Sequence, residues 1–308
     1  MVYTYPYVNG AGQDLTADDV HHFLKTPSLV AKRVAQLAAK RFISDFLLTG
    51  RYNAEGGGIS FLIDDGLYTA DDPEAINPGG DYPLTTAGEG IPEKAPTEKL
   101  GQDSEITDES IARLKMDPVD RVLKKQVNRM VARVDSKTLG VITSEVTATY
   151  TGAAWTSTGV ILDNVLSAAA NRDALDLGIS LDTVVLKPTQ FAKIAALFLA
   201  ADMVANGISD YVKAGRIPDV LGFDWVTSNY VPFTDPTLVD RDLLGGIGLE
   251  DLKSPGYSKV SGTLGVESKV WRPTDSDRDL YRTRVRRVGV AAVVEPRAGI
   301  RITGTGLV

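Results

Sequence analysis

The sequence predicts an α+β fold, and three stretches of the chain lead to that prediction. An amphipathic helical pattern runs without interruption from Pro118 to Leu139. Between about residues 155 and 255, short apolar runs alternate with helical patterns, which is typical of a mixed α/β unit. From Tyr257 to Val308, strand patterns dominate. Because the three stretches differ in type, we expect a helix-and-sheet part combined with a separate mixed part.

Composition restricts the function classes. The chain has 308 residues, 43% of them hydrophobic, which is enough apolar material for one large or two moderate cores. The net charge of −7 argues against a dedicated nucleic-acid binder, which normally carries a basic excess. The absence of cysteine excludes disulfides, thiolate catalysis and cysteine-ligated zinc. No segment approaches the ~20 apolar residues that span a bilayer, so no membrane partner is expected.

The N-terminal region is expected to be an arm followed by a helix. Residues 1–25 contain too few apolar side chains to build a core and are predicted to be extended. Thr26 and Pro27 are suited to the start of a helix. We expect this helix to run to about Leu48 and to end before Gly50.

A proline- and glycine-rich stretch follows. Alternating apolar residues at 59–63 predict a strand, and residues 64–98 then contain five prolines. Between residues 51 and 94 there is no basic residue but there are nine acidic ones. Structureless loops beyond ~12–15 residues are uncommon in compact domains. Two interpretations stay open, namely a solvated acidic loop, or an arm that reaches another molecule as a hairpin with its turn near residues 77–80.

The central helical pattern is the most regular part of the sequence. Asp117 is expected to cap the helix and Pro118 to take its first position, where the missing N–H is harmless. Gly140 is expected to end it. At 1.5 Å per residue the helix is about 33 Å long, enough to cross a domain. It has an apolar stripe of Val119, Leu123, Val127, Met130 and Val134, and basic residues at Arg121, Lys124, Lys125, Arg129, Arg133 and Lys137.

Shorter elements are expected on both sides of this helix. Before it, residues 98–106 are predicted to be extended and residues 107–115 to form a short helix. The mixed part after it contains a strand at 146–150, a helix at 160–170, a buried strand at 183–186, a helix from Pro188, a hairpin at 217–226, and stretches at 238–239 and 243–247 that complete a small sheet.

The late strand pattern has two different faces. Apolar and small residues at 281, 283 and 285 share one face, and the other face is basic, with Arg282, Arg284 and Arg286. Arg287 breaks this alternation and predicts a bulge. Residues 288–294 are expected to continue as a buried strand.

The sequence contains almost no recognisable catalytic, nucleotide-binding or metal-binding motif. The sequence has no nucleophile elbow, phosphate-binding loop or zinc-binding histidine pair, and its only histidines, His21 and His22, are adjacent. The glycines around residue 246 lack the strand–glycine–helix context of a dinucleotide loop. The acidic run at 275–279 lacks the glycine and glutamate of a calcium loop. The sequence therefore predicts no catalytic residue, no cofactor and no metal site, and favours a structural protein over an enzyme.

The order of the pieces resembles a known family. The resemblance is carried by residues 99–102 (KLGQ) with 106–109 (ITDE), by Asp117-Pro118 with the helix that follows, by residues 184–189 (VVLKPT), and by residues 215–217, 221–223 and 226–228. In this order they resemble the major capsid protein of tailed bacteriophages, which has the Hong Kong 97-type fold. The resemblance implies an N-terminal arm, an extended loop that forms a β-hairpin, a peripheral domain with a long spine helix, and a mixed α/β axial domain.

The resemblance also implies domains, an assembly and partners. It divides the chain into an N-terminal arm and helix at 1–50, an extended loop region at 51–104, a peripheral domain at 105–149 and 256–308 with its spine helix at 118–139, and an axial domain at 150–255. It implies hexamers and pentamers of an icosahedral virion shell that encloses double-stranded DNA and is assembled in the cytoplasm of a bacterial host. Other copies of the chain, a portal, decoration proteins and packaged DNA are the implied partners.

Two features depart from some members of that family. No scaffolding region precedes the arm, so we expect the scaffold to be a separate protein or to be absent. Some relatives cross-link neighbouring subunits through a lysine in the extended loop. No lysine lies between residues 41 and 93, so we expect no such cross-link here.

The resemblance, taken with the charges, implies which surfaces meet between copies. In the family that the sequence resembles, the extended loop lies across the peripheral domain of a neighbouring subunit, so we expect the acidic loop of one copy to face basic residues of the next. The contact candidates are Asp71, Asp72, Glu74 and Asp81 on the loop, Arg121, Lys124, Lys125 and Arg129 on the central helix, and Arg282, Arg284 and Arg286 on the late strand.

Two other functions stay open at this point. An encapsulin-like nanocompartment would share the fold but package proteins instead of DNA. A carboxylate-dependent hydrolase with an α/β domain would belong to another class. Particle size separates the hydrolase from the two shells, and the particle contents separate the shells from each other.

Overall fold

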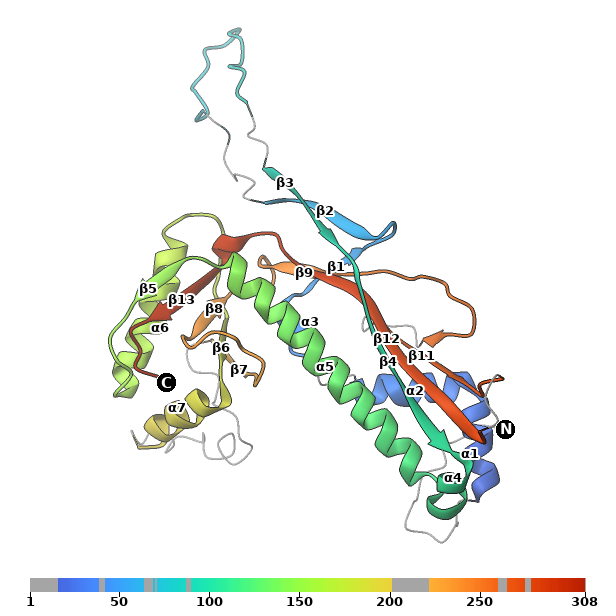
Figure 1. The fold of residues 1–308 in the computed structure, drawn as a ribbon. Helices are drawn as coiled ribbons and strands as arrows, with labels where there is room; N and C mark the ends of the chain where they lie inside the picture. Colours follow the sequence, from blue (N-terminus) through green and yellow to red (C-terminus); the bar gives the residue numbers. More distant parts are fainter. Residues whose placement is uncertain are drawn as a thin grey trace.

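The computed structural model describes residues 16–38, 42–63, 69, 71–86, 90–200, 222–259, 265–274 and 278–307. Figure 1 shows two lobes joined by one long helix, and a hairpin that projects away from both of them. The N-terminal helices belong to the first lobe, and the C-terminus lies in the second. The predicted α+β class is confirmed, because each lobe combines helices with its own sheet.

The first lobe is built on a sheet of six strands. Their order is β1 (Gly50–Asn53), β9 (Gly245–Leu249), β12 (Leu280–Val293), β11 (Val266–Trp271) and β10 (Ser258–Lys259), and β4 (Glu98–Thr107) also pairs with β12. β1 is parallel to β9, and the other pairs are antiparallel. β12 organises this sheet, since it pairs with β4 along its first part, with β9 along its last part, and with β11 on its other edge.

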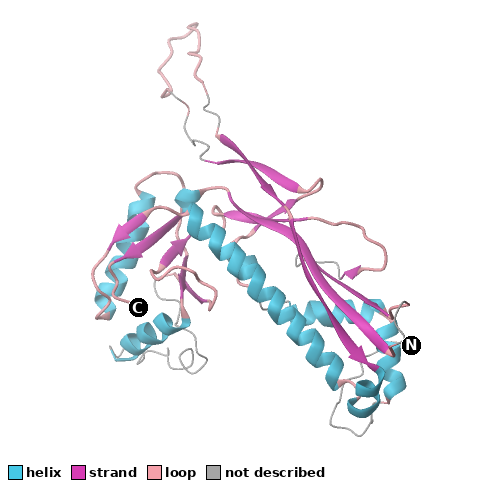
Figure 2. Ribbon diagram, in the orientation of Figure 1, coloured by secondary structure: helices cyan, strands magenta, loops and turns pink. Residues whose placement is uncertain are grey.

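Helices cover one face of this sheet (Figure 2). They are α1 (Ala17–Lys25), α2 (Pro27–Ala38) and α5 (Asp117–Glu145), with the short helices α3 (Ser44–Leu47) and α4 (Asp108–Leu114) beside them. Apolar residues of α1, α2 and α5 form one core with Tyr281 and Val285 of β12. Residues of β12 that alternate with these point to the opposite face of the sheet.

The second lobe contains a sheet of five strands. Their order is β5 (Thr149–Thr151), β13 (Gly299–Thr303), β8 (Thr237–Val239), β6 (Thr183–Leu186) and β7 (Asp224–Thr227). Two helices, α6 (Thr158–Asp173) and α7 (Pro188–Ala200), pack beside it, and the short 3-10 helix η1 (Pro296–Ala298) leads into β13. All four residues of β6 are buried, as expected for a central strand.

Helix α5 belongs to both cores. Val119, Leu123 and Val127 lie in the core of the first lobe. Leu139 and Ile142, further along the same helix, lie in the core that contains β6 and β13. With 29 residues the helix spans about 44 Å and connects the two lobes as a single rod (Figure 1). The position and straightness of α5 therefore set how the lobes are oriented.

The projecting hairpin consists of β2 (Gly58–Ile63) and β3 (Ile91–Pro96). They are antiparallel, and the register runs from Gly58 opposite Pro96 to Ile63 opposite Ile91. In the loop between them, the N–H of Gly80 donates to the carbonyl oxygen of Asn77 at 2.8 Å and closes the turn expected at residues 77–80. The strand predicted from the alternation is confirmed, and the hairpin is the one of the two open interpretations that the structure has.

The N-terminal prediction needs two corrections. Residues 17–25 are helical and not extended, because the side chains of Thr16 and Asp19 form a capping box and Phe23 is buried. Residues 1–15 lie outside the described part. The helix expected to reach Leu48 is also wrong in extent, since α2 ends at Ala38 and residues 42–43 are not helical before α3 begins.

Both predicted ends of α5 were also wrong. Asp117 is the first helical residue and Met116 the cap, which uses no side-chain hydrogen bond. Gly140 does not end the helix, which continues to Glu145. The burial of Leu139 and Ile142 on either side offsets the ~1 kcal/mol that an interior glycine costs relative to alanine.

Three strands differ from their predicted positions. Residues 243–247 do not complete the small sheet, because β9 belongs to the first lobe. β7 pairs in parallel with β6, and the remainder of the hairpin expected at 217–226 extends into residues that are not described. β13 pairs with β5 and β8 of the second lobe, although residues 256–308 were assigned to the peripheral domain.

The glycines of β9 have a packing role. A Cβ atom at Gly246 would lie 2.5 Å from the carbonyl oxygen of Gly50, and one at Gly245 would lie 2.2 Å from the carbonyl oxygen of Ala292. These glycines therefore let β1 and β12 approach β9 closely. Close strand packing therefore explains why glycines cluster in β9, where the sequence lacks the context of a phosphate-binding loop.

Candidate assembly surfaces

Among the described residues, no group of three or more histidine, cysteine, aspartate or glutamate side chains is arranged to hold a metal ion. Within the same part of the chain, no helix combines the length and the apolarity that crossing a membrane requires. Three surfaces of the molecule carry the predicted contact residues.

The first surface is the acidic loop, defined as residues 71–86 at the end of the β2–β3 hairpin. Asp71, Asp72, Glu74 and Asp81 are all exposed there. The loop also exposes two large apolar side chains, Tyr82 and Leu84. Asp64, Asp65 and Glu89, which share the same acidic stretch of sequence, lie outside the described residues.

The second surface is the exposed basic face of α5. Its exposed members are Arg121, Lys124, Lys125, Arg129 and Arg133. None of the five forms an ion pair with a residue that the structure describes, and no acidic residue lies between residues 121 and 134. By contrast, Asp120 pairs with Arg33 of α2 at 3.0 Å, and Lys137 pairs with Glu98 of β4. The basic face is therefore unneutralised along most of its length.

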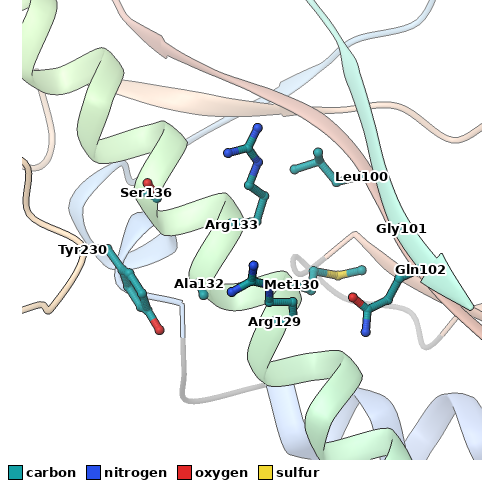
Figure 3. Close-up of a pocket in the computed structure, with 9 residues that line it drawn as sticks. All are labelled: Leu100, Gly101, Gln102, Arg129, Met130, Ala132, Arg133, Ser136 and Tyr230. Carbon is teal, nitrogen blue, oxygen red and sulfur yellow. The ribbon is translucent and has the colours of Figure 1, made fainter. Parts of the chain in front are cut away.

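A groove lies where this face meets β4 (Figure 3). Its volume is about 450 Å³, and Leu100 of β4 and Met130 of α5 line it together with Arg129 and Arg133. Tyr230, which follows β7 in the second lobe, also lines it and is 40% exposed. The groove thus combines apolar atoms with two unpaired guanidinium groups.

The third surface is the face of β12 that carries Arg282, Arg284 and Arg286. Arg282 pairs with Glu105 of β4, and Arg284 binds both carboxylate oxygens of Asp103. The hydrogen bond from Arg284 to Asp103 raises the pKa of the Arg284 guanidinium above its ordinary value. These pairs neutralise a face that the strand pattern alone predicts to be strongly basic.

Arg286 is not a surface residue at all. It is 2% exposed, it pairs with Glu267 of β11 at 2.6 Å, and its guanidinium lies over the ring of Tyr257. A buried arginine that already has a carboxylate partner is not available to a neighbouring copy. Among the predicted contact residues, the loop acids and the basic face of α5 are therefore the ones that remain free to bind.

Arg287 corrects another prediction. The register of β12 with β4 and with β11 is continuous through residues 286 and 287, so there is no bulge. Instead, Arg287 points into the helix-covered face, where it pairs with Asp45 at 2.8 Å and lies over the ring of Phe42. The irregular sequence pattern reflects a buried ion pair that ties β12 to the segment after α2.

Sequence reasoning missed several residues of these surfaces. Tyr82 and Leu84 are isolated apolar residues in a polar loop, and their isolation was the signal that could have identified them. Tyr230 carried no such signal, because only the packing of the second lobe against α5 brings it to the groove. Asp135 of α5 is buried and belongs to none of these surfaces, and it was missed because its partners, Ile43 and Ser44, are distant in the sequence.

Solved structures with the same architecture identify the fold. A capsid structure of the cyanophage P-SCSP1u has a TM-score of 0.60 and 14% identity over 83% of this chain and 86% of that chain. A structure from Microbacterium phage Oxtober96 has a TM-score of 0.56 and 11% identity, with coverages of 86% and 91%. A virus-like particle from Pyrococcus furiosus has a TM-score of 0.53 and 10% identity, with coverages of 89% and 97%. The fold is the Hong Kong 97-type capsid fold, as predicted.

The family follows from the sequence. Residues 91–302 match the family model described as phage capsid protein, and this range is well over half of the chain. The chain therefore belongs to the phage capsid protein family, and it is a structural protein of the capsid shell. No curated protein sequence matches it.

Proposed function

We propose that copies of this chain assemble as hexamers and pentamers into an icosahedral shell that encloses the double-stranded DNA of a tailed phage. The projecting hairpin carries this proposal. All residues of its loop from 71 to 86 except Ile76 are exposed, and ordering such a segment costs conformational entropy that contacts within its own lobe do not offset. Contacts with a neighbouring copy offset this loss of entropy, and head-to-tail contacts of this kind close into rings.

The proposal includes partners and a domain division. A separate scaffolding protein assists assembly in the cytoplasm of the bacterial host, and a portal and decoration proteins complete the particle. Residues 105–149 and 256–293 form the peripheral domain, and 150–240 form the axial domain. Because β13 pairs with β5 and β8, we assign residues 299–307 to the axial domain. The spine helix then extends over the full length of α5.

Particle size and contents test this function. The chain expressed with the phage's other structural proteins is expected to sediment as megadalton shells, seen as hexamers and pentamers by electron microscopy, that protect double-stranded DNA from nuclease. Particles filled with protein instead of DNA would favour the encapsulin-like alternative. A small oligomer in every preparation would contradict a shell and would favour the hydrolase.

The shell is expected to be held together without covalent bonds. No lysine lies between residues 41 and 93, so the extended loop offers no amine for a cross-link. Particles boiled in detergent should therefore give a single band near the 33.0 kDa monomer on a denaturing gel. A ladder of larger bands would contradict this, and Lys94 and Lys99 at the base of the hairpin would then be substituted first.

A further inference from the structure

The groove between β4 and α5 holds two cations that have no partner among the residues described. Arg129 and Arg133 line it, and neither forms an ion pair with any of those residues. One step of four residues separates them, which is about 6 Å along the helix. Figure 3 shows both side chains between Tyr230 and Leu100. Two guanidinium groups on one wall of a groove favour a ligand with several negative charges, and the shape of arginine suits phosphate in particular.

No carboxylate competes for these cations within the described part of the chain. The residues that line the groove there include no aspartate and no glutamate. Asp103 and Glu105 of β4 pair with Arg284 and Arg282 on the face of the sheet opposite to α5. On α5 itself, no acidic residue occurs between residues 121 and 134. An anion that enters the groove therefore displaces no ion pair of the protein.

The rest of the lining restricts the ligand further. Tyr230 is 40% exposed, so part of its ring is open to a flat partner. Leu100 and Met130 add apolar atoms, and Gln102 and Ser136 add groups that form hydrogen bonds. The volume of about 450 Å³ is within the range of small-molecule sites. This combination matches a nucleotide, because a nucleotide joins a flat base to phosphate through a polar sugar.

We propose that this groove binds a nucleotide, with its phosphate on Arg129 and Arg133 and its base on the ring of Tyr230. A free nucleoside phosphate and a nucleotide unit of a single DNA strand offer the same chemistry. A base inside a duplex does not, because the bases stacked above and below cover its two faces. Binding of this kind thus differs from a general attraction of DNA to a basic surface, and the shell function does not require it.

The position of Tyr230 makes the ligand a link between the lobes. The two arginines and β4 are parts of the first lobe, whereas Tyr230 follows β7 in the second. A nucleotide that contacts both walls of the groove holds the lobes in one relative orientation. It also stabilises the folded chain, by an amount that grows with the concentration of the ligand.

Titration of the purified chain with ATP, followed by calorimetry, tests the two arginines. Arg129→Gln with Arg133→Gln should weaken ATP binding at least about tenfold, since it removes both phosphate contacts. Arg121→Gln with Lys125→Gln is the matched control, because it removes the same charge from the same helix at residues that do not line the groove. This control should change the dissociation constant by less than about threefold, because exposed charges at a distance are screened.

Tyr230 separates a nucleotide site from a plain anion site. Tyr230→Ala should weaken ATP binding about tenfold and leave the binding of inorganic triphosphate unchanged, because only ATP carries a base that stacks. Unchanged triphosphate binding also shows that this variant is folded around the groove. Tyr230→Phe keeps the ring and should bind ATP almost as well as the natural chain does.

A single-stranded oligodeoxythymidylate of about ten nucleotides identifies the source of the ligand. If it binds more tightly than ATP and loses affinity in Tyr230→Ala, the natural ligand is a DNA strand. If ATP binds more tightly, the natural ligand is a free nucleoside phosphate. Both results support the site.

Four results would overturn the nucleotide site. They are equal affinity for ATP and triphosphate, full ATP affinity in the double arginine variant, no ATP binding at millimolar concentration, and binding of duplex DNA alone with no dependence on Tyr230. Each of them leaves the shell function standing, because the titrations do not require particles. Failure of the natural chain to form shells would instead contradict the proposed function and would not change the ATP titration.

Discussion

Val127→Pro is expected to abolish particle formation. Val127 is buried in the first core near the middle of α5. Proline there removes an interior backbone hydrogen bond, and its ring clashes with the carbonyl of the preceding turn, which together cost ~3 kcal/mol or more. Because α5 runs from one core to the other, a kink at this position also changes the angle between the lobes. We expect insoluble protein or soluble subunits, measured by sedimentation and electron microscopy.

Val127→Ala is the matched control for that experiment. It removes side-chain volume at the same buried site but leaves the backbone of α5 intact, so it lowers stability without bending the helix. Particles should form with a lower thermal midpoint. If Val127→Pro also gave normal particles, α5 would not set the geometry of the shell. If both variants failed alike, core packing and not helix continuity would be the requirement.

The elements that the sequence predicts well are those whose side chains show a clear period. The stripe on α5 and the alternation in β2 each depend on local spacing, and both elements form as expected. The end of α5 at Gly140 was wrong because a local signal competes there with burial in the second core. That core is assembled from residues distant in the sequence, so local pattern gives no information about it.

The surfaces were predictable only in part, for a related reason. Alternation placed Arg282, Arg284 and Arg286 on one face, as the structure has them. Their neutralisation by Glu105, Asp103 and Glu267 depends on the register of β4 and β11 against β12. Register is a tertiary property and has no signature in a single strand. The basic face of α5 and the acidic loop were predictable because each is a feature of one continuous stretch.

Asp135→Ala is expected to destabilise the protein strongly. Asp135 is 1% exposed, and its carboxylate accepts hydrogen bonds from the hydroxyl of Ser44 at 2.7 Å and the N–H of Ser44 at 3.0 Å. The N–H of Ile43 donates to it at 3.3 Å. Alanine leaves these three donors without an acceptor, at ~1–3 kcal/mol for each buried group. The thermal midpoint, followed by tryptophan fluorescence, should fall by roughly 10 °C.

Asp135→Asn is the matched control, and it separates the hydrogen bonds from the charge. Asparagine has almost the same shape and keeps one carbonyl oxygen that accepts from Ser44. Its cost should therefore be clearly smaller than that of alanine. If asparagine were as destabilising as alanine, the negative charge and not the set of hydrogen bonds would hold residues 43 and 44 on α5.

Comparing the stability of the natural chain with that of Asp135→Asn at different pH values tests the same site a second way, and the direction of the change can be predicted. Burial raises the pKa of Asp135 above its ordinary value of 3.8, the hydrogen bonds from Ser44 and Ile43 oppose that shift, and nearby Asp45 adds to it. Above pH 3.8 the unfolded chain therefore holds fewer protons at this group than the folded chain. The stability that Asp135 contributes is complete below that pH and declines as pH rises through the raised pKa. Asparagine does not titrate, so the advantage of the natural chain over Asp135→Asn should shrink as pH is raised from about 4 to 7. An advantage that grew with pH would mean that the hydrogen bonds outweigh the burial and that the folded protein favours the charged form.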